Sequence, residues 1–239
     1  MNVRDVPSPN FGPRRDGLKP ELVVLHYTAM ESAAAALGRL CDPAAEVSAH
    51  YLVDLDGTVW RLVPEAARAW HAGAGSWQGR GDVNSRSVGI ELQNRGDHPF
   101  PAPQMAALER LLRDVMGRWR IPPEGVIGHA DMAPGRKQDP GPRFDWRRLA
   151  REGLAIWPEA AAVADGTAAI DADMSPEEAF QAAAAAFGYP RDARLSDILR
   201  VFRQRFRPAA GSAPLDAHDL SLIGALAARW GVDPGAAGT

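Results

Sequence analysis

The chain has 239 residues, which is enough for one substantial domain and a smaller second one. Its hydrophobic fraction of 46% and charged fraction of 24% are ordinary for a globular protein. The formal net charge of -3 excludes the broad basic field that binds nucleic acids and anionic membranes. The sequence has no apolar run near the ~20 residues that span a bilayer. We therefore expect neither nucleic-acid binding nor a membrane span.

Two features bear on the cellular compartment. Residues 1–10 lack the apolar core of ~7–15 residues that marks a secretory signal. Cys41 is the only cysteine, so no internal disulfide can form, which fits a reducing compartment. Together these features predict a cytoplasmic protein. The alternative is a periplasmic protein whose signal peptide has been removed.

The first part of the chain alternates predicted strands and helices. The segment up to Lys19 is rich in proline, glycine and arginine and predicts an extended lead-in. A continuous apolar run at 22–26 predicts a buried strand, and the alanine-rich residues 31–40 predict a helix. Asp56-Gly57 is a strong hairpin signal between two short strands. These strands are expected at 50–54 and 58–63.

The alternation continues beyond the hairpin. A strand is expected at 87–92, a helix at 104–119 from its apolar spacing, and a short strand at 126–128. Asp145 has the position of an N-cap for a helix that runs through Leu154. This order of elements predicts an α/β fold with a mixed central sheet flanked by helices.

The composition changes after Pro158. Residues 160–173 have few large apolar side chains and predict a linker. Ser175 and Glu178 form a capping-box pattern with Pro176 at the first helical position, and two further helical patterns follow. The expected organisation is a first domain at 1–159 with its lead-in at 1–19, a linker at 160–173, and a small all-helical C-terminal module at 174–239.

Two of the six histidines end apolar strands. His26 closes the strand at 22–26, and His129 directly follows the strand at 126–128. Strand ends open into clefts in α/β folds, so the two imidazoles could converge there. With one carboxylate they would suit a zinc ion that keeps an open fourth position. Spacing alone leaves this open, because a hydrogen-bonded core or cleft histidine is commoner.

Four long motifs occur in a fixed order. They are Val-Ser-Ala-His-Tyr-Leu-Val at 47–53, Ala-Trp-His-Ala-Gly at 69–73, Ser-Val-Gly-Ile-Glu-Leu at 87–92, and the run from Gly-His-Ala-Asp-Met to Gln-Asp-Pro-Gly-Pro at 128–142. From 22 to 158 the chain resembles the zinc N-acetylmuramoyl-L-alanine amidases of the AmpD and AmiD type, which are related to peptidoglycan-recognition proteins. The C-terminal module is similar to the peptidoglycan-binding-like tail of the AmiD-like branch, most clearly at 202–208.

The resemblance implies roles for particular residues. One Zn2+ ion would be held by His26, His129 and Asp139. Glu91 and Lys137 would be catalytic, with Glu91 as general base for the attacking water and Lys137 beside the developing oxyanion. The substrate cleft would be lined by Trp70 and His71. Glu91 could instead be a buried carboxylate that orients the site, and Trp70 could pack in the core.

The activity that the resemblance implies is hydrolysis of the amide between N-acetylmuramic acid and L-alanine in muropeptides or peptidoglycan fragments. We predict a cytoplasmic recycling enzyme whose substrates are small soluble muropeptides, including those with 1,6-anhydro-N-acetylmuramic acid. The alternatives are a periplasmic envelope amidase of broad specificity, a non-catalytic peptidoglycan-recognition protein, and a zinc peptidase that acts on cross-bridges. The pattern specifies no oligomeric state.

Overall fold

The computed structural model describes residues 3–158 and 174–232, and the predicted linker at 160–173 lies outside this part of the chain. The chain groups into two compact units. The first consists of Met1–Ala74, Asp82–His129 and Asp139–Ile156, and the second of Gly75–Gly81, Ala130–Gln138 and Trp157–Thr239. Two stretches from the middle of the chain therefore group with the C-terminal helices. The domain boundaries at 159 and 174 stay a prediction.

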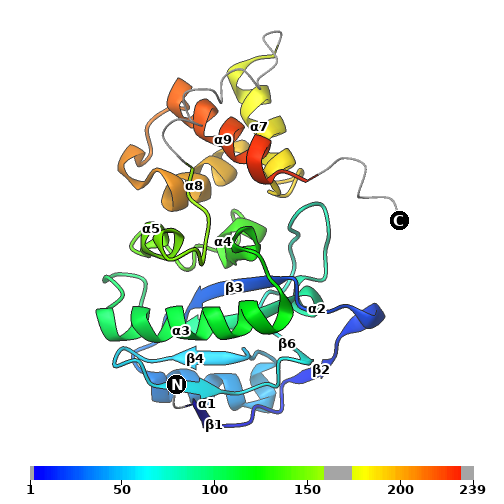
Figure 1. The fold of residues 1–239 in the computed structure, drawn as a ribbon, viewed down its shortest axis with the longest axis vertical. Helices are drawn as coiled ribbons and strands as arrows, with labels where there is room; N and C mark the ends of the chain where they lie inside the picture. Colours follow the sequence, from blue (N-terminus) through cyan, green and yellow to red (C-terminus); the bar gives the residue numbers. More distant parts are fainter. Residues whose placement is uncertain (1–2, 159–173, 233–239) are drawn as a thin grey trace. The chain divides into compact units, whose positions relative to one another are not determined.

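The first unit is built on a mixed six-stranded sheet, as the alternation of elements predicts (Figure 1). The strand order is β1-β5-β4-β7-β3-β8. Its strands are β1 Val3–Asp5, β3 Leu22–Tyr27, β4 Tyr51–Val53, β5 Val59–Arg61, β7 Ser87–Leu92 and β8 Val126–Gly128. β3 pairs in parallel with β7 and β8, whereas β4 and β5 form the predicted antiparallel hairpin. The parallel pairing brings the C-terminal ends of β3, β7 and β8 to one edge of the sheet.

The helices of the first unit follow the sequence pattern, with some ends shifted. They are α1 Ala33–Cys41, α2 Val83–Arg86, α3 Ala102–Trp119 and α5 Trp146–Arg151; α4 His129–Met132 begins in this unit, and 3-10 turns lie at Arg15–Gly17, Pro43–Ala45 and Pro123–Gly125. α1 begins after Ser32 because the Ser32 hydroxyl accepts a hydrogen bond from the Ala35 N–H. Asp145 caps α5 as predicted. The helix ends before Gly153, whose φ of 67° is left-handed.

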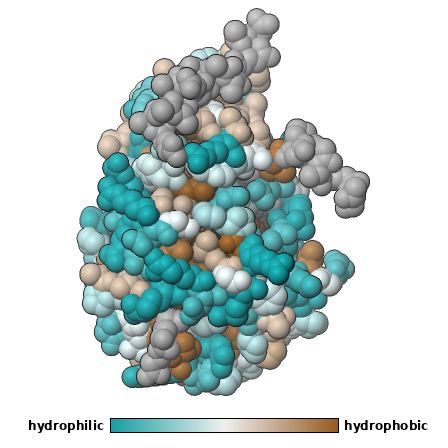
Figure 2. All heavy atoms as spheres, in the orientation of Figure 1, coloured by the Kyte–Doolittle hydropathy of each residue, from teal (hydrophilic) through white to brown (hydrophobic). Residues whose placement is uncertain are grey.

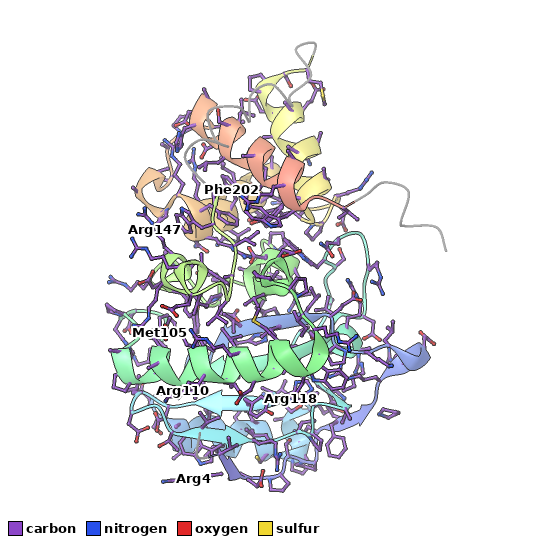
Figure 3. The ribbon with its side chains drawn as sticks, viewed as in Figure 1. Arg4, Met105, Arg110, Arg118, Arg147 and Phe202 are labelled. Carbon is purple, nitrogen blue, oxygen red and sulfur yellow. The ribbon has the colours of Figure 1, made fainter. Side chains whose placement is uncertain are left out.

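Helices cover both faces of the sheet, which explains why the central strands are apolar on both sides. Successive side chains of a strand point to opposite faces. On β4, Leu52 packs in one cluster with residues of α1, while Tyr51 lines a cavity with Leu111 of α3. The helices α1 and α3 therefore lie on opposite faces. By strand register, His26 and Glu91 share the face of Leu52. On α3, Met105 is buried, and the arginines labelled in Figure 3, Arg110 and Arg118, are exposed.

The lead-in is an integral part of the first unit. β1 pairs with β5, and β2 (Phe11–Pro13) pairs with β6 (Ala67–Ala69) in a second, two-stranded sheet. Between them, the Ser8 hydroxyl donates to the Leu40 carbonyl at 2.6 Å, and the Asn10 amide donates to the Asp42 carbonyl at 2.8 Å. The sequence predicts the extended form of this segment but not its partners, because all of them lie far along the chain.

The second unit contains the all-helical module that the sequence predicts. Its helices are α7 Pro176–Phe187, α8 Leu195–Phe206 and α9 Ala217–Trp230, with a 3-10 turn at Pro208–Ala210. The predicted capping box between Ser175 and Glu178 is confirmed. Phe180 and Phe202 are fully buried, with ring centroids 5.4 Å apart, and Phe202 is labelled on α8 in Figure 3. The aromatic positions that mark α7 and α8 in the sequence thus form the core of this module.

The surface in view is mainly polar. Figure 2 shows hydrophilic residues predominating on this face, with the apolar residues standing singly or in small groups. Such scattered apolar residues are normal for a protein surface. Within the described residues, no helix has both the length and the apolarity needed to cross a membrane.

Candidate metal centre

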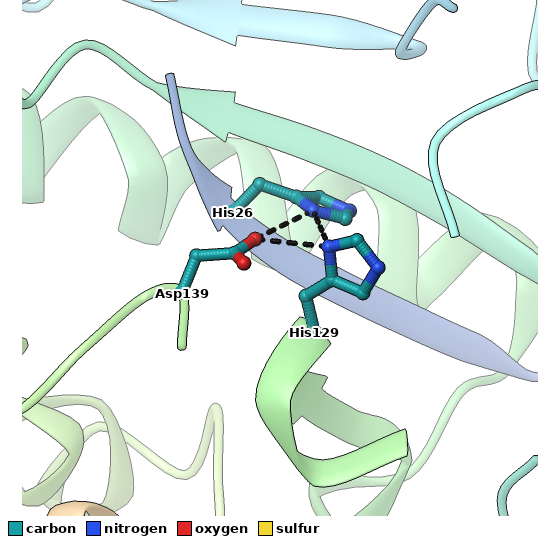
Figure 4. A group of neighbouring side chains, drawn as sticks. All are labelled: His26, His129 and Asp139. Carbon is teal, nitrogen blue, oxygen red and sulfur yellow. Dashed lines mark hydrogen bonds and ion pairs between the residues drawn. The ribbon is translucent and has the colours of Figure 1, made fainter. Parts of the chain in front are cut away.

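Three potential metal ligands converge at the sheet edge where β3 and β8 end (Figure 4). His26 comes from β3, His129 is the first residue of α4 directly after β8, and Asp139 comes from the loop that follows. The two histidine Nδ1 atoms are 2.9 Å apart, and Asp139 Oδ2 lies 2.9 Å from the first and 3.0 Å from the second. The three residues are 1%, 2% and 8% exposed. The residues that the motifs single out as ligands thus form one buried group.

The donor set of this group fits a zinc ion. Tetrahedral zinc with bonds of about 2.0–2.2 Å holds its nitrogen and oxygen ligands roughly 3.3 Å apart, and the three atoms here are separated by 2.9 to 3.0 Å. Three protein ligands leave the fourth position open, as in catalytic zinc sites. Burial alone would raise the pKa of Asp139, but its contacts with the imidazoles of His129 and His26 hold that pKa well below its usual range. The carboxylate is therefore ionised and suited to a cation.

A backbone carbonyl fixes the tautomer of His129. Its Nε2 lies 2.8 Å from the carbonyl oxygen of Ala72, which can only accept a hydrogen bond. Nε2 therefore carries the proton, and Nδ1 presents its lone pair to the other two ligands. Ala72 belongs to the Ala-Trp-His-Ala-Gly motif, so one role of that motif is to orient His129.

A chain of hydrogen bonds fixes the tautomer of His26 in the same way. His26 Nε2 lies 3.0 Å from His71 Nδ1, and His71 Nε2 lies 3.2 Å from Ser87 Oγ. The Ser87 hydroxyl donates to the Val83 carbonyl at 2.5 Å, so its oxygen is left to accept from His71 Nε2–H. His71 Nδ1 then accepts from His26 Nε2–H. This direction leaves Nδ1 of His26 unprotonated, which is the state that a metal ligand needs.

His71 is held tightly in this chain. Burial lowers the pKa of His71 well below its usual value, and the adjacent His26 and His50 lower it further. Gly89 makes room for the ring, because a Cβ at that position would lie 2.4 Å from His71 Cγ. The sequence predicts that His71 contacts substrate. The structure places its ring edge-on against that of His26, with centroids 5.1 Å apart.

His50 supports His71 from behind and is fully buried. Its Nδ1 accepts a hydrogen bond from the Gly89 N–H at 2.9 Å, so the proton of the neutral ring is on Nε2. Nε2 lies 3.1 Å from the Ala67 carbonyl, to which it donates. The His50 and His71 ring centroids are 5.7 Å apart. His50 is thus a packed and hydrogen-bonded histidine.

The other three predicted site residues are placed as follows. Glu91 is the register partner of His26 across β7 and β3, half-buried, with its side chain on the same face of the sheet. Trp70 is half-buried and exchanges hydrogen bonds with Ser48: its N–H donates to Ser48 Oγ at 2.9 Å, and its carbonyl accepts from the Ser48 N–H at 3.1 Å. Lys137 is half-buried in the stretch Ala130–Gln138 of the second unit. The roles of all three stay predictions.

Sequence reasoning missed the supporting residues of this centre. Each of these residues contacts a histidine that is distant from it in the sequence. Ser87 hydrogen-bonds to His71 and Gly89 leaves space for the same ring, while the backbone carbonyl of Ala72 accepts from His129. All three lie inside the motifs at 69–73 and 87–92. Their place in those motifs was the available signal, but nothing local specifies which histidine each one meets.

A cavity of about 510 Å³ lies on the opposite face of the sheet, where Tyr51 points. Its polar wall is the Glu65 carboxylate, which accepts hydrogen bonds from the Tyr51 hydroxyl, the Trp119 indole and the Arg118 guanidinium. These groups satisfy one another and tie the C-terminal end of α3 to the sheet. We therefore assign this cavity a structural role, separate from the candidate metal centre.

Comparison with known families shows to which protein family the chain belongs. Residues 16–142, which include the three potential ligands, match the family model described as N-acetylmuramoyl-L-alanine amidase. The chain belongs to this amidase family. The resemblance drawn from the four motifs is thereby confirmed.

Individual amidases are similar over most of the chain. AmiD of Escherichia coli is 36% identical over 89% of this chain and 84% of its own. AmpD of Enterobacter cloacae, a 1,6-anhydro-N-acetylmuramyl-L-alanine amidase, is 35% identical over 62% of this chain and 89% of its own. The structure of E. coli AmiD in complex with anhydro-N-acetylmuramic acid-L-Ala-D-gamma-Glu-L-Lys superposes with a TM-score of 0.80, at 34% identity, over 92% of this chain and 93% of that one. The fold and the enzyme class, an N-acetylmuramoyl-L-alanine amidase, are therefore established.

Proposed function

We propose that this amidase depends on one zinc ion, held by His26, His129 and Asp139, and that it cuts the amide between anhydro-N-acetylmuramic acid and L-alanine in muropeptides. The observation that carries the proposal is the buried triangle of donor atoms with sides of 2.9, 2.9 and 3.0 Å. Both histidines have their Nε2 hydrogen-bonded in a way that places the proton there and leaves the lone pair of Nδ1 for a metal ion. The Nδ1 lone pairs of both histidines point toward the Asp139 carboxylate. Such an arrangement of three electron-pair donors suits a shared cation and has no use in a purely structural pair of histidines.

The chemistry divides between the ion and the side chains. When bound, zinc supplies Lewis acidity that makes water a nucleophile near neutral pH and polarises a carbonyl. Glu91, on the same face of the sheet as His26, accepts the proton that the water loses and passes it to the leaving amide nitrogen. Lys137, two residues before Asp139 in the same motif, stabilises the negative charge that develops on the carbonyl oxygen. Trp70 offers an aromatic face to the amino sugar.

The relatives support a proposal for the substrate form. AmpD is named for 1,6-anhydro-N-acetylmuramyl substrates, and AmiD has been captured with an anhydro-muramyl tripeptide. We infer that this chain acts on the same class of small anhydro-muropeptides in peptidoglycan recycling in the cytoplasm. Fractionation of cells that produce the natural protein tests the compartment, and recovery in the envelope fraction would contradict it.

The activity is tested with defined muropeptides. The zinc-loaded protein is incubated with an anhydro-muramyl tetrapeptide and with the same peptide on ordinary muramic acid, and the products are identified by mass spectrometry. Release of intact stem peptide from the anhydro form supports the proposal. Binding without release would instead indicate a peptidoglycan-recognition protein. Shortened peptides still attached to the sugar would indicate a peptidase.

A further inference from the structure

The segment between two of the proposed ligands is held by the helical unit. His129 and Asp139 group with the first unit, whereas the intervening Ala130–Gln138 groups with the C-terminal helices. Each ligand is joined to this segment by one peptide bond. Whatever fixes the segment therefore limits where the backbones of both ligands can lie. This reasoning rests on the metal centre proposed above.

A buried ion pair joins that segment to α8. Asp131, two residues after His129, is 3% exposed, and one of its oxygens lies 2.6 Å from Nη1 of Arg205 on α8. The Tyr189 hydroxyl, just beyond α7, donates to the other oxygen at 3.1 Å. Arg205 and Tyr189 are themselves 3% and 1% exposed. A charged group so buried is strongly bound to its position, because any displacement leaves an uncompensated charge away from water.

The other mid-chain stretch of the second unit, Gly75–Gly81, contacts the same segment. The Ser76 N–H donates to the Met132 carbonyl at 3.0 Å, and a Cβ on Gly75 would lie 2.4 Å from that carbonyl oxygen. Next to it, the Trp77 ring is 1% exposed and meets the ring of Tyr189 edge-on, with centroids 5.4 Å apart. The segment is thus held within the helical unit by a backbone hydrogen bond and an ion pair, and Tyr189, which donates to Asp131, packs against Trp77.

We propose that Arg205, acting through Asp131, is a positioning residue for the metal centre, and that the helical module braces the segment that joins His129 to Asp139. The module has a structural part in metal binding under this proposal, whatever its affinity for peptidoglycan. The loss of an outer partner that orients a metal ligand typically weakens metal affinity by about 10- to 100-fold. The same range is expected when Arg205 is replaced by a methionine, which removes the ion pair with Asp131.

The same helix offers a matched control. Arg203 of α8 forms an equally buried ion pair with Asp219 of α9, and its other hydrogen bonds go to carbonyls of Gly211, Ala213 and Pro214. None of these partners belongs to the segment Ala130–Gln138. Arg203→Met therefore perturbs the helical module without touching the segment that joins the ligands.

The test is competition for zinc between the full-length protein and a chromogenic chelator, at a temperature where circular dichroism shows each variant folded. Arg205→Met should weaken zinc binding by about 10- to 100-fold, and Arg203→Met by less than threefold. The absorption spectrum of the cobalt-substituted protein should change in the first variant alone. Tyr189→Phe removes only a hydroxyl and should weaken zinc binding by a smaller factor. This variant replaces Arg205→Met in the test if Arg205→Met does not fold.

The outcomes separate the two proposals. Equal zinc affinities for the wild type, Arg205→Met and Tyr189→Phe would overturn the bracing role and leave the metal centre intact. Equal losses in Arg205→Met and Arg203→Met would also overturn it, because they would show a general effect of a weakened module. A wild-type protein that binds no zinc would overturn the metal centre, and with it the bracing role.

Discussion

The Nε2–H of His26 donates to Nδ1 of His71 across 3.0 Å, and this bond decides which nitrogen of His26 can bind a metal. The bond depends on the position of the His71 ring, which Ser87 holds from its other nitrogen at 3.2 Å. Gly89 leaves the space that the ring occupies. Strand β7 therefore supports the candidate centre at both Ser87 and Gly89, in addition to carrying Glu91.

Gly89→Ala should disturb this arrangement without changing any polar group. The new Cβ would lie 2.4 Å from His71 Cγ, so the ring must move and its hydrogen bond to His26 must lengthen. We expect zinc affinity to fall by about 10- to 100-fold, as for other losses of an outer partner. Chelator competition measures the affinity. Gly38→Ala, on α1 with nothing within 4 Å, is the control and should leave zinc affinity unchanged. An unaltered affinity in Gly89→Ala would refute the role of His71.

Glu91→Gln should separate metal binding from catalysis. The amide keeps the shape of the side chain but cannot accept the proton of the attacking water. We expect zinc content to be retained and kcat to fall by about 10²- to 10⁴-fold, the usual contribution of a general base. Metal analysis and a muropeptide release assay measure the two quantities. If Glu91 only orients the site, the variant should keep more than a tenth of the activity, which would contradict the assignment.

Zinc should stabilise the protein, and only while Asp139 is present. A metal that binds only the folded state adds about 4 kcal/mol of unfolding free energy at a free concentration 1,000 times its Kd. Wild-type protein stripped with a chelator should therefore gain several degrees in Tm when zinc is restored, together with its activity. Asp139→Ala should show neither gain. Asp145→Ala removes the N-cap of α5 and costs about 1 kcal/mol, but it should retain the full response to zinc. A zinc-dependent Tm in Asp139→Ala would exclude it as a ligand.

Local patterns in the sequence predicted much of the fold. Strand β7 and strand β8 lie where the apolar runs place them, and the capping box at Ser175 begins α7. These features depend on neighbours within a few residues. The pairing of the lead-in with β5 and β6 was not predictable, because it depends on strands some 55 residues away in the chain.

The candidate site divides in the same way. His26 and His129 could be suspected from their places at strand ends, whereas Asp139 was singled out only by the resemblance of the whole motif. Neither the contact of His71 with His26 nor that of Asp131 with Arg205 has a local signature. Both join residues that are more than 40 positions apart. Such contacts depend on the packed tertiary structure, which a single sequence does not display.

His50 should make the stability of the protein depend on pH. Burial lowers the pKa of His50 to about 3, and the charge of Arg14 opposes protonation as well. In the unfolded chain the pKa is near 6.5. Between these values the unfolded state binds a proton that the folded state does not. The His50 contribution to the free energy of unfolding should therefore be unaffected above pH 7 and should fall by ~1.4 kcal/mol for each pH unit below about 6.5.

Urea unfolding at pH 7.5, 6.0 and 5.0, with chelator present so that metal release does not contribute, measures this effect. At pH 5.0 the His50 contribution to the free energy of unfolding should be lower by about 2 kcal/mol. His50→Asn keeps an acceptor for the Gly89 N–H but cannot titrate, so its stability should decline less steeply over the same range. A long-range 1H–15N spectrum of the wild type at pH 5.0 should still show His50 as the neutral Nε2–H tautomer. Parallel pH curves for the two proteins, or a charged His50 at pH 5.0, would contradict the prediction.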